Sequence, residues 1–143
     1  MPARTASAEW NGSLKDGKGT MKMASGAYQG PYSFASRFES GTGTNPEELI
    51  AAAHSGCFSM AFSAGLGKAG FTPTSVKTTA TVHLDKMGEG MGIVRIDLDM
   101  TAQVPGIDEK TFMEVAEGAK KGCPISKALA AVPEITLKAK LIS

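Results

Sequence analysis

Two cysteines, Cys57 and Cys123, are the residues of this sequence best suited to carry chemistry, and the chain contains no others. Thiolates are nucleophiles and can be oxidised reversibly. In a reducing compartment, a lone pair of cysteines is more often catalytic or metal-binding than a structural crosslink. If the fold brings the two sulfurs together, they can cycle between dithiol and disulfide, as a thiol peroxidase requires. The alternative is that each is a small residue packed in the core.

The surroundings of the two cysteines are expected to differ. Cys57 should lie about twelve residues inside a helix, where the N-terminal dipole no longer acts. An unperturbed thiol with a pKa of about 8.5 is only about 3% thiolate at neutral pH. An activated Cys57 therefore needs a cation from elsewhere in the fold. Cys123 should lie where one helix ends and a new turn begins, and a nearby helix N-terminus would favour its thiolate.

A metal site is the rival interpretation of the cysteines. The candidate soft ligands are Cys57, Cys123, His54 and His83, but none of them falls in a Cys-x-x-Cys or His-x-x-x-His pattern. We therefore expect no metal and no bound cofactor. His54 precedes Cys57 by three residues, so it is either a general base for that thiol or a packed or solvent-facing histidine. The sequence contains no motif of a serine hydrolase, a phosphate-binding loop or a dinucleotide site.

The composition is that of one globular domain spanning residues 1–143. Hydrophobic residues make up 42% of the chain and charged residues 20%, which excludes a disordered tail, a collagen-like fibre and a cysteine-stapled miniprotein. The 15 basic and 14 acidic residues give a net charge of +1 without runs of like charge. Nucleic acid is therefore not an expected partner.

We also expect a cytoplasmic protein without a membrane partner. The first residues carry no apolar run of the kind found in a secretory signal. The longest apolar stretch, residues 49–66, is rich in alanine and glycine and is interrupted by serines and a histidine. A bilayer-spanning helix needs about 20 strongly apolar residues. This stretch therefore predicts a helix buried in protein.

The sequence predicts strands and helices in mixed order around these residues. Alternating runs predict strands over residues 5–13, 19–25 and 32–39. Asn45, Pro46 and Glu48 match the cap, the first position and the capping-box acid of a helix that should run to Lys68.

The second half of the chain predicts two long strands, two helical segments and a last strand. The strands cover residues 75–86 and 93–104 and are joined by a hairpin loop at 87–92. A helix should open at 107–108 and break at 121–124, and a short helical turn should follow through residue 129, before a strand over 134–142. The order βββ-α-ββ-α-α-β predicts the α+β class.

The helix over residues 46–68 carries apolar residues on every side. One chain has a sheet to cover one face of this helix, which leaves the opposite stripe bare. A homodimer in which the sheets of two chains enclose two such helices around a two-fold axis would cover it.

Four segments of the sequence resemble the OsmC/Ohr family, named for osmotic induction and organic hydroperoxide resistance. The segment Gly-Thr-Asn-Pro-Glu-Glu-Leu-Ile-Ala-Ala-Ala-His-Ser-Gly-Cys-Phe-Ser-Met at residues 43–60 resembles the family's signature helix, and Lys-Gly-Cys-Pro-Ile-Ser at 121–126 resembles its second-cysteine motif. Phe-Ala-Ser-Arg-Phe-Glu at 34–39 and Gly-Phe-Thr-Pro-Thr-Ser at 70–75 are similar to the OsmC branch. The likeness covers essentially the whole chain.

The resemblance implies a stress-defence peroxidase that reduces organic hydroperoxides, and hydrogen peroxide less well, without metal or haem. By this resemblance Cys57 is the peroxidatic cysteine and Cys123 the resolving cysteine. Arg37 matches the active-site arginine of the OsmC branch, and Glu47 matches its partner carboxylate. The implied fold is a tightly entwined homodimer with antiparallel sheets around two central helices. The implied reductant is an external dithiol, for example a lipoylated protein.

Physical roles follow from these matches. Arg37 would supply the cation that the thiolate lacks, although by itself it predicts a surface strand arginine paired with Glu39. Glu47 would orient Arg37, or complement the helix dipole, or do both. Large apolar side chains either line an entrance for alkyl peroxides or belong to the core: Phe58, Met60, Phe62, Met87 and Met91. A different class of function, a non-catalytic small-molecule binder with the same fold, would use neither thiol.

The spacing of Glu47 and Cys57 sets a condition on any shared site. They are ten residues apart, which is about 15 Å along a straight helix. A glutamate side chain cannot bridge that length, and the run of alanines between them favours an unbroken helix. The sequence therefore predicts a composite site in which Glu47, together with Arg37, acts on Cys57 of the other subunit.

Overall fold

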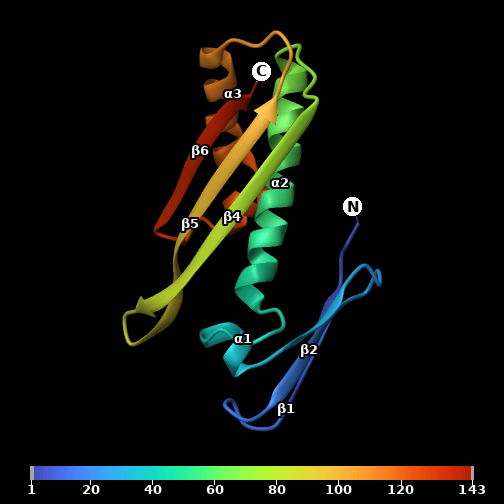
Figure 1. The fold of residues 1–143 in the computed structure, drawn as a ribbon, viewed down its shortest axis with the longest axis vertical. Coiled ribbons are helices and arrows are strands. Elements are labelled where there is room, and N and C mark those ends of the chain that lie inside the picture. The colour runs from blue at the N-terminus through green and yellow to red at the C-terminus, as the bar shows by residue number, and fades with distance from the viewer. Residues whose placement is uncertain (1, 143) are drawn as a thin grey trace. The chain divides into compact units, whose positions relative to one another are not determined.

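The computed structural model describes residues 2–142 as two compact units that meet within one long helix. One unit ends at Leu49 and the other begins at Ile50. The first unit contains β1 (Ala6–Asn11), β2 (Lys18–Met23), β3 (Gln29–Tyr32) and α1 (Phe34–Phe38). The helix α2 (Pro46–Lys68) then leads into the second unit, which contains β4 (Ser75–Met87), β5 (Gly90–Gln103), α3 (Glu109–Gly122), α4 (Pro124–Ala128) and β6 (Glu134–Ile142) (Figure 1).

The first unit is built on a three-stranded antiparallel sheet in the order β1-β2-β3. Trp10 of β1 and Tyr32 of β3 pack across the middle strand with their ring centroids 5.3 Å apart. The strand between them carries Gly19, where an added Cβ would lie 2.5 Å from the Tyr32 ring and 2.6 Å from the Trp10 ring. The aromatic pair therefore requires glycine at this position.

The strand expected over residues 32–39 is wrong, because β3 ends at Tyr32 and α1 follows. Ser33 caps α1 through a reciprocal pair of bonds with Ser36. The Ser33 hydroxyl accepts from the Ser36 N–H at 3.1 Å, and the Ser36 hydroxyl accepts from the Ser33 N–H at 2.8 Å. Phe34 and Phe38 alternate with small residues, as in a strand, but they also lie four residues apart and meet on one helix face with centroids 4.9 Å apart.

The helix α2 runs without a break from Pro46 to Lys68, as the sequence predicts. The Asn45 side chain accepts from the Glu48 N–H at 2.7 Å and caps the helix. The Glu48 carboxylate accepts from the Thr44 hydroxyl at 2.7 Å. By length and composition alone α2 is also long and apolar enough to cross a bilayer, a test that the core helices of soluble proteins pass as well.

The second unit is a mixed sheet with α2 and α3 packed on one face (Figure 1). β4 and β5 form the expected antiparallel hairpin, with strands that extend further into the predicted loop. β6 pairs with β5 in parallel, which corrects the expectation of purely antiparallel sheets. The reason is that α3 and α4 carry the chain back along the sheet, so that β6 starts from the same end as β5. The α+β class itself is confirmed.

The core of the second unit lies between this sheet and the helices. It is formed by fully buried side chains of α2, β5 and α3, among them Phe58, Phe62, Ile96, Leu98, Met100 and Phe112. Phe58 and Phe62 are therefore core residues and line no entrance. Met60, Met87 and Met91, by contrast, are exposed at 77%, 42% and 53%.

Candidate active site

Arg37 and Glu47 form a bidentate ion pair in the first unit. Arg37 Nε donates to Glu47 Oε1 and Nη2 donates to Oε2, each at 2.9 Å. Glu47 is buried, whereas the Arg37 side chain is 37% exposed and its guanidinium also lies 5.2 Å from the Phe38 ring centroid. The hydrogen bond with Glu47 raises the pKa of Arg37 further above its ordinary value. The expected surface pairing of Arg37 with Glu39 is thus wrong, and Glu47 holds the guanidinium in one orientation.

Local hydrogen bonds explain how α1 presents Arg37 to the start of α2. The Ser36 hydroxyl donates to the Thr44 carbonyl at 2.7 Å, and the Asn45 side chain donates to the Ser36 carbonyl at 2.9 Å. Ser36 and Thr44 are both buried. These bonds hold the last turn of α1 beside the first turn of α2, which brings residues 37 and 47 together.

An apolar cavity of about 200 Å³ adjoins Arg37 within the same unit. Aromatic and aliphatic side chains make most of its lining, which consists of Trp10, Leu14, Tyr32, Ser33, Phe34, Arg37 and Phe38. A guanidinium at the wall of an aromatic cavity can bind a polar head while the cavity takes an apolar group.

Cys57 and Cys123 meet in the second unit. Cys57 lies on α2, and Cys123 lies at the junction where α3 ends and α4 begins, as its sequence context predicts. Their Sγ atoms are 2.6 Å apart, and Cys123 is fully buried while Cys57 is half-buried. Both cysteines are free thiols. Little movement separates them from the S–S distance of about 2.05 Å in a disulfide.

The two thiols have pKa values displaced in opposite directions. Burial raises the pKa of Cys57, and the hydrogen bond with Cys123 raises it further. Burial also acts to raise the pKa of Cys123, but hydrogen bonding with Cys57, Ser126 and the Ile125 backbone outweighs it and lowers that pKa. Within this unit, therefore, the anion is better stabilised on Cys123 than on Cys57.

A buried histidine and serine lie next to the thiols in sequence. His54 precedes Cys57 by three residues and Ser126 follows Cys123 by three. His54 Nε2 and Ser126 Oγ are 2.7 Å apart, and His54 is fully buried. Sequence reasoning singled out His54 but missed Ser126, although its spacing from Cys123 mirrors that of His54 from Cys57.

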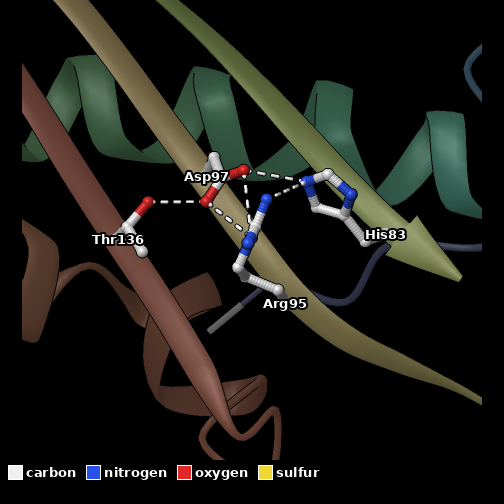
Figure 2. A network of polar contacts seen from close by, with 4 residues as sticks. All are labelled: His83, Arg95, Asp97 and Thr136. Atoms are coloured by element: carbon white, nitrogen blue, oxygen red, sulfur yellow. Dashed lines mark hydrogen bonds and ion pairs between the residues drawn. The ribbon is translucent and has the colours of Figure 1, made fainter. Parts of the chain in front are cut away.

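A second polar cluster, also missed from the sequence, lies on the outer face of the sheet (Figure 2). Asp97 of β5 binds three neighbours: His83 at 2.8 Å, Arg95 at 3.1 Å and the Thr136 hydroxyl at 2.6 Å. The hydrogen bond from Thr136, followed by that from His83, lowers the pKa of Asp97. These contacts link β4, β5 and β6, and the cluster contains no cysteine.

The described residues offer no ligand set for the metal interpretation of the cysteines. In residues 2–142, no group of three or more histidine, cysteine, aspartate and glutamate side chains is placed to hold an ion. His83 pairs with Asp97, and His54 pairs with Ser126.

Comparisons with known proteins agree on one family. The family model described as "OsmC-like protein" matches residues 39–138. "Peroxiredoxin OsmC" of Escherichia coli (strain K12) is 55% identical over 137 residues, which cover 95% of this chain and 94% of that protein. The "Organic hydroperoxide resistance protein" of Xanthomonas axonopodis pv. citri (strain 306) is 32% identical over 98 residues, which cover 68% of this chain and 67% of that protein.

Solved structures extend the likeness to the fold. The OsmC-like protein from Mycoplasma pneumoniae superposes with a TM-score of 0.77 at 17% identity and covers 99% of both chains. The organic hydroperoxide resistance protein OhrB of Bacillus subtilis superposes with a TM-score of 0.69 at 22% identity and covers 96% of this chain and 98% of that one.

Proposed function

This chain belongs to the OsmC family, and we propose that it is a thiol-dependent peroxidase in which Cys57 attacks hydroperoxides and Cys123 resolves the product. Its activity is that of a cysteine-based peroxidase in stress defence. The observation that supports the assignment of residues is the approach of the two sulfurs to 2.6 Å, from positions 66 residues apart in the sequence. A core packing role would not require the two thiols to meet.

The redox chemistry of the cycle takes place between the two thiols, a hydroperoxide and an external dithiol. The Cys57 thiolate attacks one oxygen of the peroxide, the O–O bond breaks, and the alcohol leaves after taking up a proton. Cys57 is then a sulfenic acid, which condenses with Cys123 to a disulfide and water. An external dithiol, for which a lipoylated protein is our candidate, reduces the disulfide and returns both thiols.

Arg37 is our candidate for activating the first step. Within the second unit burial raises the pKa of Cys57, so its thiolate needs a cation that the thiol pair itself does not supply. The ion pair with Glu47 uses two of the five N–H donors of a guanidinium. We propose that the remaining donors bind the thiolate and the peroxide, and that Glu47 fixes their direction.

We propose that the complete centre is shared by two chains of a homodimer. Because α2 is unbroken, Glu47 and Cys57 are separated by about 15 Å of helix rise. One stripe of α2 is exposed and consists of small residues and one methionine: Ala52, Ala53, Gly56, Met60, Ser63, Ala64 and Gly67. A second copy of α2, running antiparallel, would cover this stripe and bring Arg37 and Glu47 of one chain to Cys57 of the other.

The substrates we propose are organic hydroperoxides in preference to hydrogen peroxide. The cavity of about 200 Å³ beside Arg37 is lined largely by aromatic rings and offers burial to an alkyl or aryl group. Hydrogen peroxide has no such group, so it gains nothing from the cavity. We further propose a single domain over residues 1–143 and a cytoplasmic location, where a dithiol reductant is available.

A thiol titration tests the function against the alternative of a non-catalytic binder. The reduced protein is mixed with a small excess of tert-butyl hydroperoxide, and free thiols are counted before and after a dithiol is added. A peroxidase loses two thiols per chain and recovers both, whereas a binder keeps both throughout. Repeating the measurement with cumene hydroperoxide and hydrogen peroxide gives the order of substrate preference.

A further inference from the structure

His54 of α2 and Ser126 of α4 form a buried polar pair that the two-cysteine cycle does not use. Both residues belong to the unit that holds the thiols, and both are shielded from solvent, with exposures of 0% and 7%. Ser126 lies one helical turn after Cys123, the residue that precedes α4, and interaction with Ser126 acts to lower the pKa of the Cys123 thiol. The three groups His54, Ser126 and Cys123 therefore follow one another in a series, which we call the donor chain.

The hydrogen-bond capacity of each group fixes the direction of this chain. Nδ1 of His54 has no hydrogen-bond partner within residues 2–142, so a proton placed there would be a buried, unpaired donor. The proton therefore belongs on Nε2, which donates to the Ser126 oxygen in their 2.7 Å contact and leaves the single hydroxyl hydrogen of Ser126 free to point toward Cys123. His54 is then neutral, with its second ring nitrogen, Nδ1, unprotonated.

The state of Nδ1 supports this assignment. Of the buried side-chain nitrogen and oxygen atoms in residues 2–142, Nδ1 of His54 is the one without a hydrogen-bond partner. A protonated ring would bury an unpaired N–H, and burial indeed lowers the pKa of His54. A histidine kept only for structure would be expected to satisfy both nitrogens. Here a single nitrogen is used, and it points to the serine that lies one helical turn after Cys123.

We propose that His54 is a positioning residue for the resolving step, holding the Ser126 hydroxyl in the orientation that donates to Cys123 and stabilises its thiolate. The inference rests on the proposed role of Cys123. In the step concerned, the Cys123 thiolate attacks the sulfenic sulfur of Cys57, an S–S bond forms and the S–O bond breaks. Cys123 sulfur is oxidised as Cys57 sulfur is reduced, and the departing hydroxide combines with the proton that Cys123 has released.

Loss of His54 or Ser126 should affect the two steps of the cycle differently. It should slow disulfide formation and leave the first attack by Cys57 unchanged. It should also raise the fraction of protein that is overoxidised to sulfinic acid, since a longer-lived sulfenic acid meets a second peroxide more often. We expect resolution to slow about three- to tenfold. The effect is moderate because a thiol of higher pKa is less ionised, whereas its thiolate is intrinsically more nucleophilic.

The test compares Ser126→Ala, His54→Leu and His54→Gln with the parent protein. Ser126→Ala removes the hydroxyl, His54→Leu removes the donor, and His54→Gln retains an N–H near the position of Nε2. The control is His83→Leu, which removes the chain's other histidine, bound to Asp97 on the outer face of the sheet. Rapid mixing with one equivalent of cumene hydroperoxide, followed by quenching and intact-mass analysis, gives the rates of both steps and the sulfinic fraction.

A second measurement reports the Cys123 thiolate directly. In a Cys57→Ser background, the rate of alkylation of Cys123 is followed against pH. Cys57 is the titratable group that acts directly on Cys123, so this background isolates the donor chain. We expect Ser126→Ala and His54→Leu to move the profile to higher pH, and His54→Gln and His83→Leu to leave it near the parent.

Wild-type resolution rates and alkylation profiles in both Ser126→Ala and His54→Leu would overturn the proposal. Equal slowing in His54→Gln and His54→Leu would also overturn it, because the retained N–H should rescue the step. Failure of the two-cysteine cycle is detected separately with Cys123→Ser. If that variant turns over like wild type, the proposed function fails. If it stalls while the His54 and Ser126 variants resolve normally, only the present inference fails.

Discussion

The ion pair of the first unit and the thiol pair of the second unit are built in opposite ways. Arg37 and Glu47 carry complementary charges, and their bidentate bonds hold the guanidinium in one position. Cys57 and Cys123 are two like groups at 2.6 Å, which cannot both ionise at that distance. In the function that we propose, the first arrangement supplies a fixed positive charge and the second supplies the redox couple.

The difference shows that the thiol pair alone favours the wrong cysteine for the first step. Within the second unit the pKa of Cys57 is raised and that of Cys123 is lowered, which suits resolution but not attack on a peroxide. In the centre that we propose, the cation on Arg37 reverses this order. The proposal therefore assigns activation and resolution to different parts of the chain, which single substitutions should disable independently.

The largest expected effect comes from removing either thiol. Cys57→Ser should abolish peroxidase turnover, because no nucleophile remains. Cys123→Ser should allow one oxidation per chain and then stall as sulfenic or sulfinic acid. Steady-state assays with a dithiol, combined with intact-mass analysis after one peroxide addition, measure both. Wild-type turnover by both single variants would rule out the two-cysteine cycle.

The next effect tests whether the ion pair activates the thiol pair. Arg37→Met should slow attack on peroxide by about a hundredfold or more, since the half-buried Cys57 thiol loses its cation. The pKa of Cys57 should rise, so the alkylation profile moves to higher pH and the deficit narrows as the pH increases. Arg95→Met removes an exposed arginine of the outer cluster and serves as the control. An unchanged profile in Arg37→Met would show that the cation comes from elsewhere.

Subunit exchange tests whether the ion pair and the thiol pair act within one chain. Equal amounts of Cys57→Ser and Glu47→Ala subunits are mixed under conditions that exchange them. Half of the dimers are then mixed, and a composite site leaves one of their two centres complete, so about a quarter of wild-type activity should return. Mixed dimers as inactive as the parents would place the whole site within one chain.

The sequence predicted the elements whose signals are local. The cap at Asn45, the alternation along β5 and the break before Pro124 each depend on a few neighbouring residues, and all three are found in the structure. The prediction for segment 33–38 is wrong because Phe34, Ser36 and Phe38 are two and four residues apart, which satisfies the periods of both strand and helix. A capping box made by two serines, rather than by a serine and a glutamate, gave a weak signal.

The site was less predictable than the fold, because it depends on contacts between distant segments. The pairing of Arg37 with Glu47 followed only from the family resemblance, since Glu39 lies nearer to Arg37 in sequence. The approach of Cys57 to Cys123 and the parallel pairing of β6 depend on how the α3–α4 crossover returns across the sheet. Ser126 carried no signal by itself, because a lone serine in a short helix is usually a surface residue.

The smallest expected effect concerns the outer cluster around Asp97, which we expect to stabilise the sheet and to take no part in the thiol chemistry. Asp97→Asn should lower the stability of the protein at neutral pH and leave peroxidase activity unchanged. The hydrogen bonds from Thr136 and His83 depress the folded-state pKa of Asp97, so its contribution is present above the unfolded pKa of about 3.9 and is lost as the pH falls through the folded value. The difference in the free energy of unfolding between variant and wild type should therefore shrink from pH 7 to pH 3 in denaturant titrations.

Asp99→Asn, a substitution at the next outward-facing and exposed position of β5, is the matched control. A stability loss of the same size at every pH would assign the effect to packing rather than to charge, and a loss of peroxidase activity would place this cluster in the catalytic centre.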